Sequence, residues 1–230
     1  MKTFTASLFV AVLAFGAVAA VAAQQAGSSD LLTASQVRQL IASAQPADHA
    51  RLRAHFEALS AKYTADAARH TAMAGSAGGN PNHRSGGDPA GHHNRLAALA
   101  KDSAGITREL ATHHGQLAGG AASTAPRDSA RFEQGAGAPA TPSEKQLLDL
   151  AAKASTPSQH GELVEYYESL VKQYSADATD HSAMAAAYRG SKSGASMASH
   201  CDRLVQIARL EVKEATALAA GHKQLATGAR

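Results

Sequence analysis

Imidazole, carboxylate and thioether side chains recur at helical spacing in two segments of this chain. One segment, "YTADAARHTAMA", begins at Tyr63, and the other, "YSADATDHSAMA", begins at Tyr174. In each, an aspartate lies four residues before a histidine and a methionine lies three residues after it, so all three share one helical face. A carboxylate beside an imidazole can accept the ring's second N–H, as in the surroundings of many metal-bound histidines. The resulting candidate ligands are Asp66, His70 and Met73, and Asp177, His181 and Met184.

Further histidines repeat with the same spacing. The chain has 12 histidines, and eight of them form four matched pairs separated by 111 or 108 residues: His49 and His160, His70 and His181, His92 and His200, His114 and His222. If each segment folds as a hairpin, we expect His70 to lie beside His92 and His49 beside His114. Imidazoles would then gather at the ends of a helical bundle, with Cys201 adding a thiol next to His200.

The donor types indicate which metal such a site would prefer. Imidazole with thioether and thiolate suits copper, whereas imidazole with carboxylate suits zinc or nickel. The same residues also have a structural interpretation, in which histidine and aspartate form hydrogen-bonded layers that fix the register of the helices. Methionines commonly fill cores, and Cys201 could be a small buried apolar residue or form an intermolecular disulfide. We expect Tyr63 and Tyr174 in the core, with hydroxyls that reach the polar layer.

These side chains must be positioned by helices, because the chain is rich in alanine and poor in aromatic residues. The internal duplication predicts two helical repeats, 31–120 and 141–228, joined by a flexible linker over 121–140. Each repeat is expected to begin with a short helix, capped by Thr33 with Gln36 and by Thr141 with Glu144. Long helices should follow from Pro46 and from Pro157, since proline is favoured in a first helical turn.

Seven-residue spacing in the long helices predicts a bundle seam. The first long helix carries His49, Phe56, Tyr63 and His70, with Leu52, Leu59, Asp66 and Met73 three residues further on; the second copy repeats this arrangement. A helical hairpin alone leaves an apolar stripe exposed, so two hairpins should pair into an all-α, four-helix-bundle-like domain. The hairpin loops could lie together or apart, and exchange between two molecules, giving a homodimer, would bury the same stripes.

The first residues and the composition bear on location and partners. Lys2 followed by an apolar run that ends at Ala23 is typical of a signal peptide over 1–23, which predicts a periplasmic or secreted protein without a membrane span after cleavage. The formal charge of +3 falls to +2 without Lys2, and the basic residues form no block. Together with the few aromatic residues, this argues against a nucleic-acid partner.

Several enzymatic chemistries lack their motifs. The sequence has no E-x-x-H, C-x-x-C-H, C-x-x-C, H-E-x-x-H or G-x-S-x-G, which removes di-iron, covalent haem, thioredoxin-type, zincin and serine-hydrolase sites. Non-covalent haem is disfavoured because aromatic residues fill the positions between the histidines. The sequence therefore predicts an exported, non-enzymatic protein that binds copper, or else zinc or nickel, as a carrier, buffer or resistance factor. The alternative is a structural or stress-related envelope protein without metal.

Overall fold

The computed structural model describes residues 31–80, 87–119, 143–191 and 194–228, which are all-helical and contain no strand. The predicted signal peptide and the predicted linker over 121–140 lie outside the described residues. The helices are α2 (Ala34–Ser43), α3 (Pro46–Gly78), α4 (Pro89–Leu117), α5 (Glu144–Lys153), α6 (Pro157–Arg189) and α7 (Ala195–Thr227). Their order confirms two copies of a short helix followed by a long hairpin.

The helix starts follow the sequence signals with one exception. Thr33 and Gln36 form the predicted capping box of α2, and α3 and α6 begin at Pro46 and Pro157. The prediction that Thr141 and Glu144 cap α5 is wrong: Ser143 is its N-cap and forms the capping box with Gln146. The two patterns overlap, and the structure uses the later one because extended backbone at Ser143 lets its hydroxyl reach the Gln146 amide.

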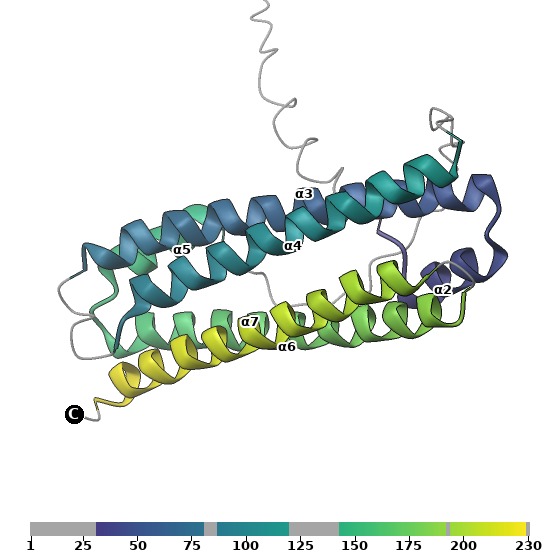
Figure 1. Ribbon diagram of the computed structural model, residues 1–230. Helices are drawn as coiled ribbons and strands as arrows, with labels where there is room; N and C mark the ends of the chain where they lie inside the picture. The colour runs from purple at the N-terminus through teal and green to yellow at the C-terminus, as the bar shows by residue number, and fades with distance from the viewer. Residues whose placement is uncertain (1–30, 81–86, 120–142, 192–193, 229–230) are drawn as a thin grey trace, which may run out of the picture.

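The two hairpins pack with their turns at opposite ends of the molecule (Figure 1). Helix α3 packs along α4, α6 packs along α7, and α4 packs against α7. Cross-hairpin contacts fix α3 and α6 as antiparallel, because Tyr63 meets His181 and His70 meets Tyr174. Of the two arrangements that the sequence left open, the structure has the one with the loops apart.

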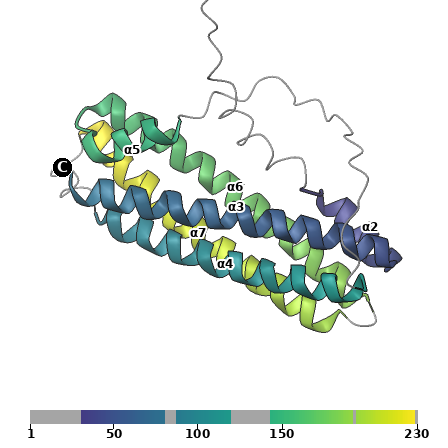
Figure 2. The same ribbon diagram turned by 90° about the horizontal axis from the view of Figure 1, so that it is seen from above.

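The short helices connect the hairpins to each other. Helix α2 packs on α6 as well as on its own α3, and α5 packs on α3 as well as on its own α6. Figure 2 shows α5 and α2 near opposite ends of the α3–α6 side of the bundle. Each repeat therefore places its short helix partly on the other repeat, so that the two units interlock.

The seven-residue pattern buries most of the side chains that it predicts. Phe56, Tyr63, Tyr167 and Tyr174 are at most 3% exposed, and the leucines three or four residues away are also buried. Alanines complete the core and allow close helix packing, including Ala100, Ala104 and Ala208. The core is therefore a polar-and-apolar seam that runs along the bundle axis.

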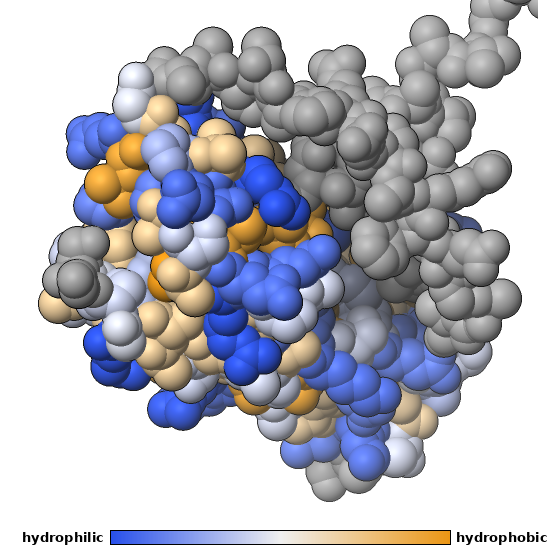
Figure 3. All heavy atoms as spheres, turned by 90° about the vertical axis from the view of Figure 1, so that its right-hand side faces the viewer, coloured by the Kyte–Doolittle hydropathy of each residue, from blue (hydrophilic) through white to orange (hydrophobic). Residues whose placement is uncertain are grey.

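At the bundle end near α2, hydrophilic residues are interspersed with apolar ones in the part of the surface that Figure 3 colours. Among the large apolar residues, Leu117 and Leu210 are exposed. None of the described helices combines the length and the apolar character that crossing a membrane requires.

Candidate metal centre

Three pairs of histidines face each other inside the described part of the bundle. In each pair the two Nδ1 atoms lie close together: 3.1 Å for His49 and His114, 3.2 Å for His70 and His93, and 3.1 Å for His160 and His222. Each pair joins the two helices of one hairpin. Five of the six rings are 3% exposed or less, and His49 is half-buried.

Burial keeps several of these rings neutral. It lowers the pKa of His70 to about 4, and burial together with neighbouring histidines lowers the pKa of His114 to about 3. Burial also lowers the pKa values of His49 and His160. A neutral imidazole carries one N–H and one lone pair. At a separation of about 3.1 Å, one Nδ1 therefore donates its proton to the other.

Tyrosine hydroxyls hold the outer nitrogens of three of these rings, and they come from the opposite hairpin. Tyr174 Oη lies 2.9 Å from His70 Nε2, and Tyr167 Oη lies 2.9 Å from His93 Nε2. Tyr188 Oη lies 2.7 Å from His114 Nε2. The contact between Tyr63 Oη and His181 Nε2, at 2.8 Å, is the repeat-related counterpart of the one between Tyr174 and His70. The hydroxyls of Tyr63 and Tyr174 thus reach the polar layer, as the sequence indicated.

The predicted pairing of His70 with His92 is wrong, because the neighbouring residue His93 occupies that place. Adjacent residues on a helix point in directions about 100° apart, so only one of the two can face the core. His92 instead contacts Glu214 of α7 at 2.6 Å, beside Arg95. His200 lies 3.5 Å from Glu109 of α4. The structure therefore puts His92 and His200 at the α4–α7 boundary, away from the paired imidazoles.

The aspartates do not hold the histidines of their own helices. Asp66 pairs with Arg69, and Asp177 pairs with Lys62 of the opposite hairpin at 3.0 Å. The expected carboxylate partner of each imidazole is therefore a tyrosine hydroxyl instead. Asp66 Oδ2 is buried without a hydrogen-bond partner among the described residues, so this carboxylate is only partly satisfied by its arginine.

The sulfur donors lie in the core. Met73, Met184 and Cys201 are 0–3% exposed, and burial raises the pKa of the Cys201 thiol to about 12. Met73 Sδ is 3.9 Å from the hydroxyl of Tyr166, whereas Met184 and Cys201 belong to one apolar cluster. Cys201 is thus a protonated, enclosed thiol.

The imidazoles are distributed along the core and are not gathered at its tips. His70 and His181 lie about two turns from the midpoints of their own helices, α3 and α6. Each contacts a tyrosine, Tyr174 or Tyr63, that lies near the midpoint of the opposite long helix. The pairs His49–His114 and His160–His222 lie at the open ends of their hairpins. Because the loops are apart, these two pairs lie at opposite ends of the bundle.

Sequence reasoning missed three buried polar residues. His93 could be placed in the core only if the rotation of α4 about its axis were known. Its correspondence to Cys201 in the repeat was nevertheless a usable signal. His55 accepts a hydrogen bond from the Leu32 amide at 3.1 Å and so ties the start of repeat 1 to α3. Glu211 is 2% exposed, and burial, with repulsion from Asp177, raises its pKa to about 8. Neither residue has an equivalent of its kind in the other repeat.

The pairs offer two nitrogen donors each and no more. Among the described residues, no group of three or more histidine, cysteine, aspartate or glutamate side chains is placed to hold a metal ion. Structural zinc takes four protein ligands, whereas copper(I) accepts two. The pairs could therefore hold copper(I) through two imidazole nitrogens each.

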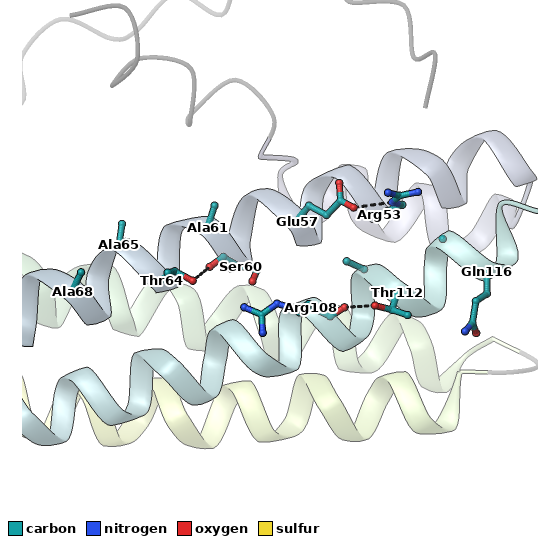
Figure 4. A pocket seen from close by; sticks show the side chains of 12 residues that line it. Arg53, Glu57, Ser60, Ala61, Thr64, Ala65, Ala68, Arg108, Thr112 and Gln116 are labelled. Atoms are coloured by element: carbon teal, nitrogen blue, oxygen red, sulfur yellow. Dashed lines mark hydrogen bonds and ion pairs between the residues drawn. The ribbon is translucent and has the colours of Figure 1, made fainter. Parts of the chain in front are cut away.

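A surface groove lies away from these pairs. A groove of about 940 Å³ runs between α3 and α4 and is lined by small and charged side chains, among them Ser60, Thr64, Arg108 and Gly115 (Figure 4). At the positions matching Ser60 and Gly115, repeat 2 has Val171 and Lys223. The groove thus results from small residues particular to repeat 1, and none of the paired histidines lines it.

In comparisons with known proteins, no family model, curated protein or solved structure matches this chain.

Proposed function

We propose that this protein is an exported, non-enzymatic carrier or buffer that binds copper(I) between paired histidines in its core. The observation that carries the proposal is the set of three Nδ1–Nδ1 contacts at 3.1–3.2 Å. Each places two imidazole nitrogens at one point, and five of the six rings are buried. Neutral imidazole is the form that ligates metals.

The geometry requires a small adjustment for an ion to enter. A metal ion bonded at about 2.0–2.1 Å to each of two nitrogens separates them by up to about 4 Å when the three atoms are in line. Each pair would therefore open by less than about 1 Å. The ion would take the place of the proton that lies between the two Nδ1 atoms, and that proton would move to Nε2 of the same ring, so that both rings stay neutral. In His70, His93 and His114 the tyrosine hydroxyls would continue to orient Nε2, as partners of a metal-bound histidine commonly do.

Copper titration of matched variants tests the proposal. In a Cys201→Ser background, which removes the thiol, we expect anaerobic Cu(I) to remain bound after gel filtration at about one ion per pair. Combining His49→Gln, His70→Gln and His160→Gln, which removes one ring from each pair, should abolish retention. The control combines His92→Gln, His113→Gln and His200→Gln, outside the pairs, and should bind as the parent does.

Circular dichroism must show that all these variants remain helical. The proposal is wrong if the Cys201→Ser protein retains no copper, or if the variant with one ring removed from each pair retains as much as its parent. Affinity should also fall as the histidines of the pairs are protonated, so binding that is equal at pH 7 and pH 4 contradicts imidazole ligation.

One observation favours a second candidate, a structural protein of the cell envelope without metal. The contacts Tyr63–His181 and Tyr174–His70 are reciprocal across the two hairpins. Such buried polar contacts can fix helix register. This second function gains support if copper is not retained while Tyr63→Phe and Tyr174→Phe destabilise the fold.

A further inference from the structure

The two hairpins carry different donors at one matched position. His93 of α4 and Cys201 of α7 are 108 residues apart and correspond in the repeat. His70 and His181 correspond too, and each binds the matched tyrosine of the other hairpin. Because His70 Nδ1 faces His93 Nδ1, the repeat makes Cys201 the counterpart that faces His181.

His181 has an unused nitrogen on that side. Its ring is 3% exposed, its Nε2 contacts the hydroxyl of Tyr63, and its Nδ1 has no hydrogen-bond partner among the described residues. In the first hairpin the same atom is satisfied by a second imidazole. A buried polar atom without a partner destabilises the fold, so this nitrogen indicates a position for a ligand.

Sulfur atoms supply the other donors of the same region. Cys201, Met184 and Met197 are at most 5% exposed and belong to one core cluster. Met184 lies three residues after His181 on the same face of α6, and Met197 lies one turn before Cys201 on α7. Thiolate and thioether sulfurs are soft donors that select copper(I).

We propose that His181 and Cys201 form a copper(I) site of imidazole and thiolate, with Met184 and Met197 as supporting thioether donors. The inference rests on the proposed copper function and assigns one site a different chemistry. Binding forms bonds from Cu(I) to Nδ1 and Sγ and releases the thiol proton to solvent, without oxidation or reduction. Bonds of about 2.0–2.1 Å to nitrogen and 2.3 Å to sulfur place the two donors beyond hydrogen-bond distance, in agreement with the unpaired Nδ1.

The repeat itself supplies the test variants. Cys201→Ser removes the sulfur at nearly constant size, Cys201→His recreates the pair of the first hairpin, and His181→Leu removes the nitrogen. Each protein is loaded with anaerobic Cu(I). Bound copper is counted, and the ultraviolet thiolate-to-copper absorption and the sulfur signal in copper X-ray absorption are recorded.

We expect wild type to bind one ion more than Cys201→Ser and to show both sulfur signals. Cys201→His should keep the additional ion without the thiolate-to-copper absorption, and His181→Leu should weaken binding of this ion at least tenfold in competition with a chelator. A thiolate-to-copper absorption in wild type no stronger than in Cys201→Ser, or His181→Leu binding as wild type does, would overturn the inference.

The two proposals fail in different ways. If the histidine pairs bind nothing but this site is real, Cys201→Ser binds no copper while wild type binds one ion. If the pairs bind and this site does not, wild type and Cys201→Ser bind equal amounts. Thermal unfolding of the copper-free proteins checks that each variant folds, and Cys201→Ala replaces Cys201→Ser if the serine hydroxyl is not tolerated.

Discussion

Tyr63 and Tyr174 each connect a long helix to a histidine of the other hairpin. Their hydroxyls are buried and lie within 2.9 Å of the imidazole nitrogens. Burial raises the pKa of both tyrosines well above its usual value, so the phenols stay protonated and can donate. Removing either hydroxyl should therefore weaken the packing of one hairpin on the other.

We expect Tyr174→Phe to lower the free energy of unfolding by about 1–3 kcal/mol, because His70 Nε2 loses its partner in a buried site. The related change Tyr63→Phe should act similarly on His181. Urea denaturation measures both. The control is Tyr166→Phe, because the hydroxyl of Tyr166 contacts a thioether at 3.9 Å and not an imidazole. A loss for Tyr166→Phe as large as for the other two would show that the tyrosine–histidine contacts contribute nothing particular.

Acid should destabilise the protein through its buried histidines. Burial lowers the pKa of His55, His70 and His181 to about 4 and that of His114 to about 3. Between these values and the unfolded value of 6.5, the unfolded chain binds more protons than the folded one. Stability is thus fully present above pH 6.5 and is lost as pH falls through the folded pKa values.

Each unit of pKa shift corresponds to about 1.4 kcal/mol, so the expected loss between pH 6.5 and pH 4.5 is several kcal/mol. Urea denaturation across this range measures it, and His70→Gln should reduce the slope by removing one titrating ring. Equal stability at pH 6.5 and pH 4.5 would contradict the assignment of these rings as buried and neutral.

Glu211 should act in the opposite direction. Its pKa of about 8, raised by burial and by Asp177, keeps the carboxyl protonated at neutral pH in the fold, whereas the unfolded chain ionises above about 4.5. This contribution is present below pH 4.5 and is lost as pH rises through 8. We expect Glu211→Gln to be more stable than wild type at pH 9 by a few kcal/mol and equal to it near pH 5.

Glu214→Gln is the control for this comparison, since the Glu214 carboxylate is paired with His92 and Arg95. Urea denaturation at pH 5 and pH 9 measures the free energy of unfolding of each protein. A Glu211→Gln protein no more stable than wild type at pH 9 would mean that Glu211 is ionised and stabilised in the fold.

Sequence patterns specified which residues lie in the core and left their partners undetermined. The seven-residue spacing placed the histidines and tyrosines inside, because burial follows from the helical face. The choice between His92 and His93 depended on the rotation of α4 about its axis. The choice of tyrosine over aspartate as the imidazole's partner depended on how the hairpins face each other. Neither quantity is encoded within a single helix.

At the scale of the helices, glycines interrupt otherwise strong helix formers. Gly105 in α4 and Gly161 in α6 have open space where a Cβ would be, and neither has a positive φ. Alanine at either position should raise the free energy of unfolding by about 0.5–1 kcal/mol, because glycine loses more backbone entropy on folding. Chemical denaturation tests this.

Gly194 is the contrasting position, at the start of α7. A Cβ there would meet the backbone oxygen of Tyr188, so Gly194→Ala should destabilise the turn between α6 and α7. Stabilisation by Gly194→Ala, or destabilisation by Gly105→Ala, would contradict the packing described here.

Prolines, capping residues and periodicity predicted where the helices begin, with the N-cap of α5 as the exception. Two overlapping capping patterns began at Thr141 and Ser143, and sequence alone could not rank them. The crossing of α2 and α5 onto the opposite hairpins was also beyond the sequence, because a short amphipathic helix can bury its apolar stripe on either hairpin.

For the whole molecule, the crossed short helices make the two repeats mutually dependent. Because α2 packs on α6 and α5 packs on α3, cleavage at a protease site introduced within 121–140 should leave the halves associated. Gel filtration after cleavage should show one species of unchanged size. Separation of the halves under native conditions would contradict the interlocked arrangement.

The row formed by Tyr174, His70, His93 and Tyr167 has a direction. With one proton between the two Nδ1 atoms, a hydrogen on His70 Nδ1 requires Tyr174 to donate to His70 and His93 to donate to Tyr167; moving that hydrogen to His93 reverses every donor in the row. The core of this protein thus contains a dipole with two opposite orientations, switched only when four groups reorient in concert.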